Sequence, residues 1–561
     1  MDEKREVRMA CEWFKEKSFY QIWIRSFCDG NGDGIGDLYG VYNKLEYIKS
    51  LGVDGIWFSP IYPSPNADFG YDISDYKNIH PEYGDLEQFK KVLNKAHEMG
   101  LKVIMDLVIN HTSDEHPWFI ESCKGKDNPY SDYYIWRDGK NKKLPNNWDS
   151  LFEGKAWEYV PSRDQYYLHI FAKKQPDLNM DNPKVREEVK SIMRFWLDMG
   201  VDGFREDVIT FISKVDGLPN GLPFIPMANG MPFYKDGPHI HEYLEEFREV
   251  CNDYDCFLLG EGPMTTTKSA LRYLSGDNHT LDIMFNFDHM MADCFLTEYI
   301  HRPFNLIKLK KAYSKWQKEL NGKAWNTLYI ENHDHPRVVS RYGSEKYHRE
   351  SATMLAASFI FQQGTPFIYQ GQEIGMTNIK LDSIDKYVDV SSKTNYHKFH
   401  TRDSIEKRLE RIYYSSRDSA RTPMQWDDSD HAGFSEAEPW FYVNENYRKI
   451  NVKAQESDDY SVLNFYRKCL DYRKKSEVIL WGDYKEYFRK DPFLYEYERS
   501  YKGKKVLVVC SFSEHKMPVL VPKEYKDMDG YIKGEIVLCN YQTYDENTLQ
   551  PYESRVYEFE P

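Results

Sequence analysis

Eight short apolar segments alternate with amphipathic stretches, and this alternation restricts the possible folds more than any other feature of the chain. Parallel strands buried on both faces are almost continuously apolar, as these segments are. Gly100 and Gly200 follow the last apolar turn of two helical stretches, where helix C-caps are common. The pattern predicts an α/β fold, a closed (β/α)8 TIM barrel. The segments are residues 19–27, 53–60, 102–110, 201–209, 257–262, 280–288, 326–334 and 365–373.

The uneven spacing of these segments predicts the domain organisation. The third and fourth segments are separated by far more chain than one helix needs. We therefore expect an inserted domain at 111–180, above a catalytic barrel formed by 1–110 and 181–479. A second long insertion, about 375–440, follows the eighth strand and should lie at the same face. Short alternating segments predict a C-terminal antiparallel β-sandwich at 480–561.

Charge and cysteine usage exclude several classes of protein. With 74 Lys and Arg against 89 Asp and Glu, the net charge is −15, which disfavours a nucleic-acid binder. No segment approaches the ~18 uncharged apolar residues of a membrane span. The charged N-terminus shows no signal peptide, and the 9 cysteines include no CxxC pair. We expect a cytoplasmic protein with reduced cysteines, a monomer or alternatively a dimer.

Four of the predicted strands end in carboxylates, namely Asp106, Asp207, Glu261 and Asp334. In a TIM barrel the active groups stand at these C-terminal strand ends. A single carboxylate there could be a solvated strand end, but four should converge on one face. Neighbouring carboxylates raise one another's pKa, so one can stay protonated while another is ionised. A pair about 5–5.5 Å apart is typical of a retaining glycosidase.

Seven short motifs in the chain are similar to motifs of a known enzyme family. It resembles the α-amylase family (glycoside hydrolase family 13), and most closely its oligo-1,6-glucosidase branch, over essentially its whole length. Four motifs surround the strand-end carboxylates, and the other three are typical of the branch. The motifs are DLVINH (106–111), GFREDVI (203–209), GEG (260–262), ENHDHPR (331–337), QPDLN (175–179), NADFGYDISDY (66–76) and SRDSARTPMQW (416–426).

The resemblance implies three catalytic residues and two histidines that bind the substrate beside them. Asp207 would be the nucleophile that forms a covalent glucosyl-enzyme, and Glu261 the acid that protonates the leaving oxygen and then activates water. Asp334 would bind ring hydroxyls and favour the distorted transition state. His111 and His333 would hydrogen-bond hydroxyls of the same sugar.

Five further residues would bind the substrate. Arg205 shares a strand face with the nucleophile and would keep it ionised. Asp68 and Arg417 resemble the pair that grips the non-reducing 4-hydroxyl and closes the pocket, which makes cleavage exo-acting. Tyr71 and Phe171 resemble aromatic platforms for that glucose, although packing at the top of the barrel would also explain them.

Val208, directly after the nucleophile, bears on linkage preference. Within the branch, Val at this position resembles α-1,6-acting enzymes, whereas Ala or Thr accompanies α-1,4-acting ones. A β-branched side chain would narrow the entrance to the leaving-group site. The alternative is that Val is simply a good strand residue.

The segment DGNGDGIGD resembles the first half of an EF-hand loop, and the branch carries a structural calcium there in several members. Gly40 replaces the bidentate Glu of a true EF-hand. The alternative is a Gly-rich turn with solvated Asp side chains. The expected calcium ligands are the side chains of Asp29, Asn31, Asp33 and Asp37 and the carbonyl of Ile35.

Two positions depart from the pattern of the branch. Glu206 replaces the usual Met and should point from the strand toward the surrounding helices. An unpaired carboxylate there would cost several kcal/mol or stay protonated, so we expect a Lys or Arg partner or hydrogen bonds from a neighbouring strand. His335 replaces the usual Gln beside Asp334, so the leaving-group side should differ.

The sequence thus predicts a retaining exo-acting α-glucosidase for α-1,6 bonds of isomaltose-type oligosaccharides, with no organic cofactor. The first alternative is a sucrose isomerase or transglucosylase, but its RLDRD-like segment is absent. The second is an α-1,4-glucosidase or sucrose hydrolase, which Val208 disfavours. A trehalose-6-phosphate hydrolase is disfavoured by the form of QPDLN. A non-catalytic amylase-like protein is disfavoured because Asp207, Glu261 and Asp334 are all present.

Overall fold

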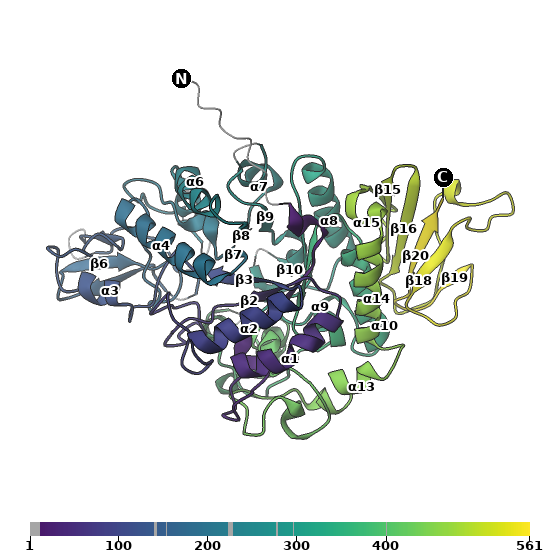
Figure 1. Cartoon of the computed structure of the whole chain (residues 1–561), viewed down its shortest axis with the longest axis horizontal. Coiled ribbons are helices and arrows are strands. Elements are labelled where there is room, and N and C mark those ends of the chain that lie inside the picture. Colours follow the sequence, from purple (N-terminus) through teal and green to yellow (C-terminus); the bar gives the residue numbers. More distant parts are fainter. Residues whose placement is uncertain are drawn as a thin grey trace.

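The computed structural model describes residues 12–560, apart from 140–142, 153, 223–227, 277–278, 296 and 400. The charged segment on which the signal-peptide prediction rests lies mostly outside the described residues. Figure 1 shows a central barrel with a small unit on one side and an antiparallel sheet on the other. This arrangement confirms the predicted fold class.

Eight parallel strands form the barrel, one in each predicted apolar segment. The open edges, β9 and β12, meet through side chains: Thr327 Oγ1 donates to the Met284 carbonyl at 2.9 Å, and the Tyr329 hydroxyl to the Asn286 carbonyl at 2.8 Å. The barrel is therefore nearly closed. In hydrogen-bonded order the strands are β12 (Thr327–Leu328), β13 (Thr365–Tyr369), β1 (Phe19–Ile22), β2 (Gly55–Phe58), β3 (Lys102–Leu107), β7 (Gly203–Glu206), β8 (Phe257–Glu261) and β9 (Ile283–Phe285).

Aromatic side chains fill the barrel interior. Phe19 stacks on Phe257 and Phe367 at 5.7 and 5.1 Å between ring centroids, and Trp57 and Phe285 complete the layer. These residues alternate along their strands with residues that pack against the outer helices, so both faces are buried. The aromatic residues, which make up 16% of the chain, thus partly serve as the barrel core.

Amphipathic helices surround the barrel (Figure 1). Gly200 ends α4 in a left-handed conformation with φ of 107°, and Gly100 follows α2 with φ of 71°, as predicted for C-caps. The longer helices are α1 (Leu38–Ser50), α2 (Leu86–Glu98), α4 (Pro183–Met199), α6 (Ile240–Cys251), α7 (Thr267–Leu274), α8 (Leu306–Leu320), α10 (His348–Ile360) and α14 (Val462–Lys475). The shorter ones are α5 (Met231–Tyr234), α9 (Val338–Tyr342), α13 (Val452–Glu456) and α15 (Glu477–Trp481).

The insertion between β3 and α4 carries helix α3 (Pro117–Ser122) and a three-stranded antiparallel sheet. Its strands, in the order β4 (Trp136–Arg137), β6 (Gln165–Leu168) and β5 (Trp157–Val160), lie beside the barrel in Figure 1. Lys214, which follows β7, forms an ion pair with Asp177 at 2.9 Å. This buried contact ties the insertion to the barrel beside the strand that carries the proposed nucleophile.

The insertion after β13 contains helices α11 (Val390–Lys398) and α12 (Ile405–Tyr413) and a 3-10 helix, η7 (Arg417–Ala420). Asp389 caps α11 by accepting hydrogen bonds from Ser391 and Ser392. Arg417 lies 3.2 Å from Asp334, which follows β12, and Asp389 lies 2.6 Å from Arg417. The insertion therefore lies at the predicted face.

A five-stranded antiparallel sheet forms the C-terminal unit, in the order β14-β15-β16-β20-β18. One face packs on α10, α14 and α15 of the barrel, and the other is covered by a two-stranded sheet of β17 (Met517–Pro518) and β19 (Thr548–Leu549). The five strands are β14 (Asp483–Tyr487), β15 (Leu494–Tyr501), β16 (Lys504–Ser511), β20 (Ser554–Phe559) and β18 (Glu535–Cys539).

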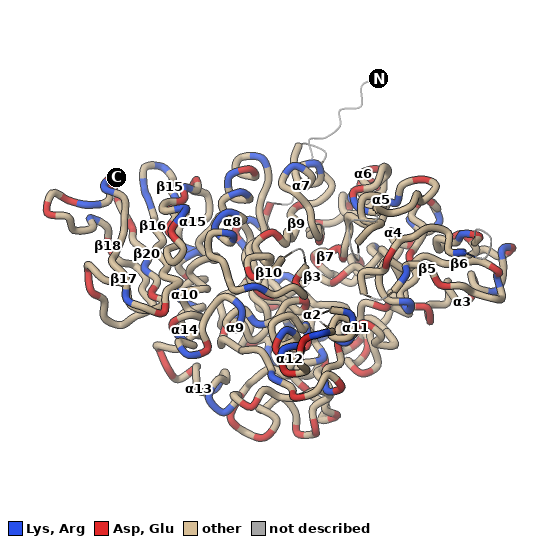
Figure 2. Tube along the Cα trace, turned by 180° about the vertical axis from the view of Figure 1, so that it is seen from behind, with Lys and Arg blue, Asp and Glu red and all other residues tan. Residues whose placement is uncertain are grey.

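Within the described part of the chain, no helix combines the length and the apolar character that crossing a bilayer requires. Figure 2 shows acidic and basic residues interspersed over the visible surface, without a basic face in this view.

Candidate active site

A cavity of about 320 Å³ opens where the barrel strands end. The three predicted catalytic carboxylates line it together with Asp68, Tyr71, His111, Phe171, Val208 and Arg417. These residues come from both insertions, from β8, and from the loops that follow β2, β3, β7 and β12. The structure therefore brings the predicted substrate residues together, with Arg205 and His333 behind them.

Arg205 on β7 organises the reaction centre. Its side chain is 1% exposed, and its Nη1 lies 2.7 Å from Asp207 Oδ1 and 2.8 Å from Asp106 Oδ1, while Nη2 lies 2.5 Å from Glu261 Oε1. One guanidinium thus holds three carboxylates. Because the two nitrogens of a single fork bind Asp207 and Glu261, these two carboxyl groups are close neighbours on the floor of the cavity.

Burial has the largest effect on the pKa values of the three carboxyl groups that Arg205 holds. It raises the pKa of Asp207 and of Glu261 to about 7, against the opposing effect of Arg205. The same balance raises the pKa of Asp106 to about 7. Because these three carboxyl groups interact, each pKa value describes the set as a whole and not one residue alone. A proton can therefore remain at the reaction centre near neutral pH, as general acid catalysis requires.

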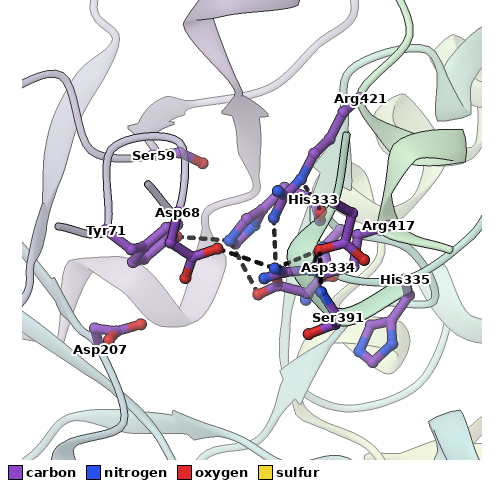
Figure 3. A network of polar contacts seen from close by, with 12 residues as sticks. Ser59, Asp68, Tyr71, Asp207, His333, Asp334, His335, Ser391, Arg417 and Arg421 are labelled. Carbon is purple, nitrogen blue, oxygen red and sulfur yellow. Dashed lines mark hydrogen bonds and ion pairs between the residues drawn. The ribbon is translucent and has the colours of Figure 1, made fainter. Parts of the chain in front are cut away.

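Asp334 stands opposite, within a second network (Figure 3). Its Oδ1 accepts hydrogen bonds from Arg417 Nη1 at 3.2 Å and Arg421 Nη2 at 3.1 Å. Burial raises the pKa of this carboxyl, but His333 and the two guanidinium groups outweigh it and hold the pKa well below its usual value. Burial lowers the pKa of His333 to about 4, so the imidazole is neutral and the fixed arginine charges keep Asp334 ionised.

Asp68 and Arg417 close one end of the cavity. Arg417 Nη2 lies 2.9 Å from Asp68 Oδ1 and 2.6 Å from Asp389 Oδ1. Gln175, from the inserted domain, donates to Asp68 Oδ2 at 3.3 Å. Segments from three parts of the chain therefore meet at this end of the cavity.

Neutral and aromatic side chains complete that end. His111 Nε2 lies 3.0 Å from the Tyr71 carbonyl, and burial lowers the pKa of His111 to about 4. The ring of Tyr71 stacks on His333 with 5.3 Å between centroids, and Phe171 lies 5.1 Å from the His111 ring. Hydrogen-bonding groups next to aromatic faces are the chemistry that binds a pyranose ring.

Val208 has an unusual backbone. Its φ of 37° and ψ of 39° place a β-branched residue in the left-handed region, which costs about 1–3 kcal/mol and needs support from its surroundings. Its N–H donates to Glu261 Oε2 at 3.0 Å. The position after the nucleophile therefore both lines the cavity and holds the proposed acid.

Several site residues were given no role from the sequence. Asp106 was named only as a strand-end carboxylate. Gln175 lies in QPDLN and Arg421 in SRDSARTPMQW, so signals for both existed. Asp389 had none beyond its place before a helix, because only the folded insertion brings it to Arg417. The same holds for Glu298, which lies on β11 (Thr297–His301), paired with β10 (Cys294–Phe295).

The prediction of a partner for Glu206 is wrong. Its side chain is fully buried, and neither carboxyl oxygen has a hydrogen-bond partner in the described part of the chain. Arg248 influences it electrostatically, but Nη2 of that arginine pairs with Asp282 Oδ2 at 3.0 Å. Burial raises the pKa of Glu206 to about 8, so protonation takes the place of a partner.

The predicted calcium loop precedes α1. Asp29 Oδ2 accepts from the Gly34 N–H at 2.8 Å, and Asp33 Oδ1 from the Ile35 N–H at 2.9 Å, as in an Asx turn. Asp37 caps α1 through the Gly40 N–H. Hard oxygen donors suit Ca²⁺. Among the residues that the structure describes, however, no three acidic, His or Cys side chains are placed to hold a metal ion, so calcium stays a prediction.

Comparison with known sequences relates nearly the whole chain to one family. The sequence model of the alpha amylase catalytic domain matches residues 21–482. The chain is 50% identical to the oligo-1,6-glucosidase of Parageobacillus thermoglucosidasius, across 97% of this chain and 98% of that protein.

Two solved structures share the fold over their full length. The trehalose-6-phosphate hydrolase of Bacillus licheniformis superposes with a TM-score of 0.93 at 43% identity, covering 98% of this chain and 100% of that one. The isomaltulose synthase of Protaminobacter rubrum has a TM-score of 0.93 at 38% identity, covering 98% and 99%.

Proposed function

The chain belongs to the alpha-amylase family and is a glycoside hydrolase of the α-glucosidase type, and from this premise we propose its substrate and its mode of action. It removes single glucose units from the non-reducing end of α-1,6-linked oligosaccharides, and the released glucose retains its anomeric configuration. The observation that carries the proposal is the Asp207 and Glu261 pair on one guanidinium, at the floor of a cavity that Asp68 and Arg417 close at one end.

The closed end supports exo-action. A terminal glucose that enters the cavity would meet Asp68 and Arg417, which would bind its 4-hydroxyl, and their ion pair would bar a further sugar beyond it. Tyr71 and Phe171 would flank the ring. Asp334, ionised by its arginines, would accept hydrogen bonds from ring hydroxyls that strengthen as the ring distorts.

The proposed reaction has two steps. Asp207 attacks the anomeric carbon while Glu261 transfers its proton to the glycosidic oxygen, so one C–O bond forms as the other breaks and the leaving sugar departs neutral. Glu261, now a carboxylate, takes a proton from water. The resulting hydroxide equivalent displaces Asp207 and releases α-glucose. Arg205 stabilises both carboxylates whenever they are charged.

Three observations bear on the linkage. Val208 lines the cavity beside the proposed nucleophile, and the relative from Parageobacillus thermoglucosidasius is named an oligo-1,6-glucosidase. The similar solved structures include a trehalose-6-phosphate hydrolase and an isomaltulose synthase, so the same fold serves other glucosides and glucosyl transfer. Hydrolysis of α-1,6 bonds is the proposal, and transfer to a sugar is its alternative.

The experiment compares initial rates on isomaltose, maltose, sucrose and trehalose 6-phosphate, with the products separated by chromatography. We expect the highest kcat/KM on isomaltose. A preference for another glucoside, or a rearranged disaccharide as main product, would overturn the substrate assignment. Asp207→Asn is the control: it keeps the side-chain shape, should lower kcat by at least about 10⁴-fold, and should leave the circular dichroism spectrum unchanged.

A further inference from the structure

We infer that Glu298, held in place by His335, binds the leaving sugar and makes the outer half of the cavity selective for neutral, hydroxyl-rich leaving groups over phosphorylated ones. The inference rests on the proposed function, because it concerns the sugar that departs when a terminal glucose is removed. It assigns substrate contact to Glu298 and a positioning role to His335.

The two side chains form a defined pair in the cavity wall. His335 Nδ1 lies 3.1 Å from both carboxyl oxygens of Glu298. The His335 side chain is 2% exposed, whereas that of Glu298 is 26% exposed. The carboxylate, and not the imidazole, is therefore the member of the pair that a ligand can reach.

The pair lies away from the end where the terminal glucose would bind. Asp68 pairs with Arg417 at the closed end, whereas His335 packs against Phe287, and all four residues line the cavity. In Figure 3, His335 lies across Asp334 from Asp68. A sugar attached to the bound glucose would project toward this second region.

His335 is built to orient Glu298. Its ring packs edge-on against Phe287 with 5.6 Å between centroids, and its Nε2 has no hydrogen-bond partner among the residues that the structure describes. The Glu298 carboxylate is thus the one side-chain hydrogen-bond partner of His335 in that part of the chain. Nδ1–H donates to the carboxylate and holds it against the wall, because a free Glu on a hairpin would sample several rotamers.

Charge gives the site its selectivity. A carboxylate accepts hydrogen bonds from sugar hydroxyls but repels a phosphate. The described lining carries five carboxylates, including Glu298, and one arginine, Arg417, whose charge is already shared among Asp68, Asp334 and Asp389. No arginine or lysine in the described lining is therefore free to bind a phosphate group.

The first test separates sugar binding from a structural role. Glu298→Ala should lower kcat/KM for isomaltose by about 10- to 100-fold, the value of a hydrogen bond to a charged group. Activity on p-nitrophenyl α-glucoside, whose leaving group has no sugar hydroxyls, should change less than about twofold. Equal losses on both substrates would show that Glu298 only supports the fold and would overturn the inference.

The second test addresses charge. Glu298→Gln keeps the shape and removes the charge, so it should raise the ratio of kcat/KM for trehalose 6-phosphate to that for isomaltose by about tenfold, and Glu298→Lys should raise it further. The matched control is Glu16→Gln, which removes an exposed charge at the opposite end of the barrel and should leave the ratio unchanged. An unchanged ratio in the Glu298 variants would contradict the charge argument.

The third test asks whether His335 acts through Glu298. His335→Ala should cause a smaller, isomaltose-specific loss, and His335→Gln, which keeps an N–H donor, should restore part of it. In Glu298→Ala the further change His335→Ala should add nothing. Additive losses would overturn the positioning role.

These outcomes are distinguishable from failure of the proposed function. If the unaltered enzyme cleaves another disaccharide better than isomaltose, the proposed linkage fails. The Glu298 comparison is then made with that disaccharide against p-nitrophenyl α-glucoside, and equal losses on those two substrates would still overturn the inference.

Discussion

Arg205 illustrates how one residue can set the chemistry of a site. Its two terminal nitrogens hold the proposed nucleophile and the proposed acid, while burial raises the pKa of both carboxyl groups to about 7. The guanidinium cannot lose its proton, so it balances whichever carboxylate is charged at each step. The sequence predicted its pairing with Asp207 but not its contacts with Asp106 and Glu261.

Val208 provides a residue-scale test of linkage preference. Val208→Ala removes two methyl groups from the cavity wall and keeps the N–H that binds Glu261. We expect the ratio of kcat/KM for maltose to that for isomaltose to rise about tenfold or more, the scale on which one or two methyl groups change specificity. Activity on p-nitrophenyl α-glucoside controls for damage to the reaction centre. An unchanged ratio would mean that the Val208 side chain does not determine the linkage preference.

Glu206 should make stability depend on pH. Its pKa is about 8 in the folded protein and about 4.5 when unfolded, so the folded state binds more protons between these values and stability falls as pH rises through this window. Glu206→Met should therefore stabilise the enzyme at pH 8, by up to about 4 kcal/mol, and much less at pH 5.

Thermal unfolding of the Glu206 variants at both pH values measures this effect. Glu206→Gln is the matched control, because it removes ionisation but keeps a polar group. If Glu206→Met shifts the Tm equally at pH 5 and pH 8, the carboxyl group does not carry the predicted proton.

At the scale of elements, the loop before α1 carries the calcium prediction. Ca²⁺ bound to the folded loop alone would stabilise the enzyme by about 2.7 kcal/mol at one hundred times its Kd. We expect EDTA to lower the Tm, added Ca²⁺ to restore it, and Asp33→Ala to remove this response. Asp33 is exposed, so the substitution should not disturb packing. A Tm that is insensitive to EDTA would contradict the prediction.

The barrel strands could be predicted from the sequence because both faces of each strand are buried, which leaves continuous apolar segments. β14 and the two-stranded sheet of the C-terminal unit were not predicted, because short or half-exposed strands such as Asp483–Tyr487 carry little of this signal. Contacts between residues that no recognised motif pairs were equally hidden. Asp389 meets Arg417, and Glu298 meets His335, only through the folded arrangement of distant segments.

Glu206 shows that the free-energy cost of burying a carboxylate does not by itself predict how the protein offsets that cost. The sequence argument correctly held that a buried carboxylate needs compensation, but it expected a cation. Arg248 has Asp282 as its ion-pair partner, and the compensation is a retained proton. Which of two compensations a buried acid uses depends on the competing partners around it, and a strand pattern does not contain that information.

At the scale of the whole molecule, we propose that the cavity closed by Asp68 and Arg417 and the Asp207 and Glu261 pair together release terminal glucose with retention of its anomeric configuration. The most direct measurement is proton NMR of the first products from isomaltotetraose. The account predicts that α-glucose and isomaltotriose appear first, without isomaltose. Early isomaltose would contradict exo-action, and β-glucose as the first anomer would contradict the proposed roles of Asp207 and Glu261.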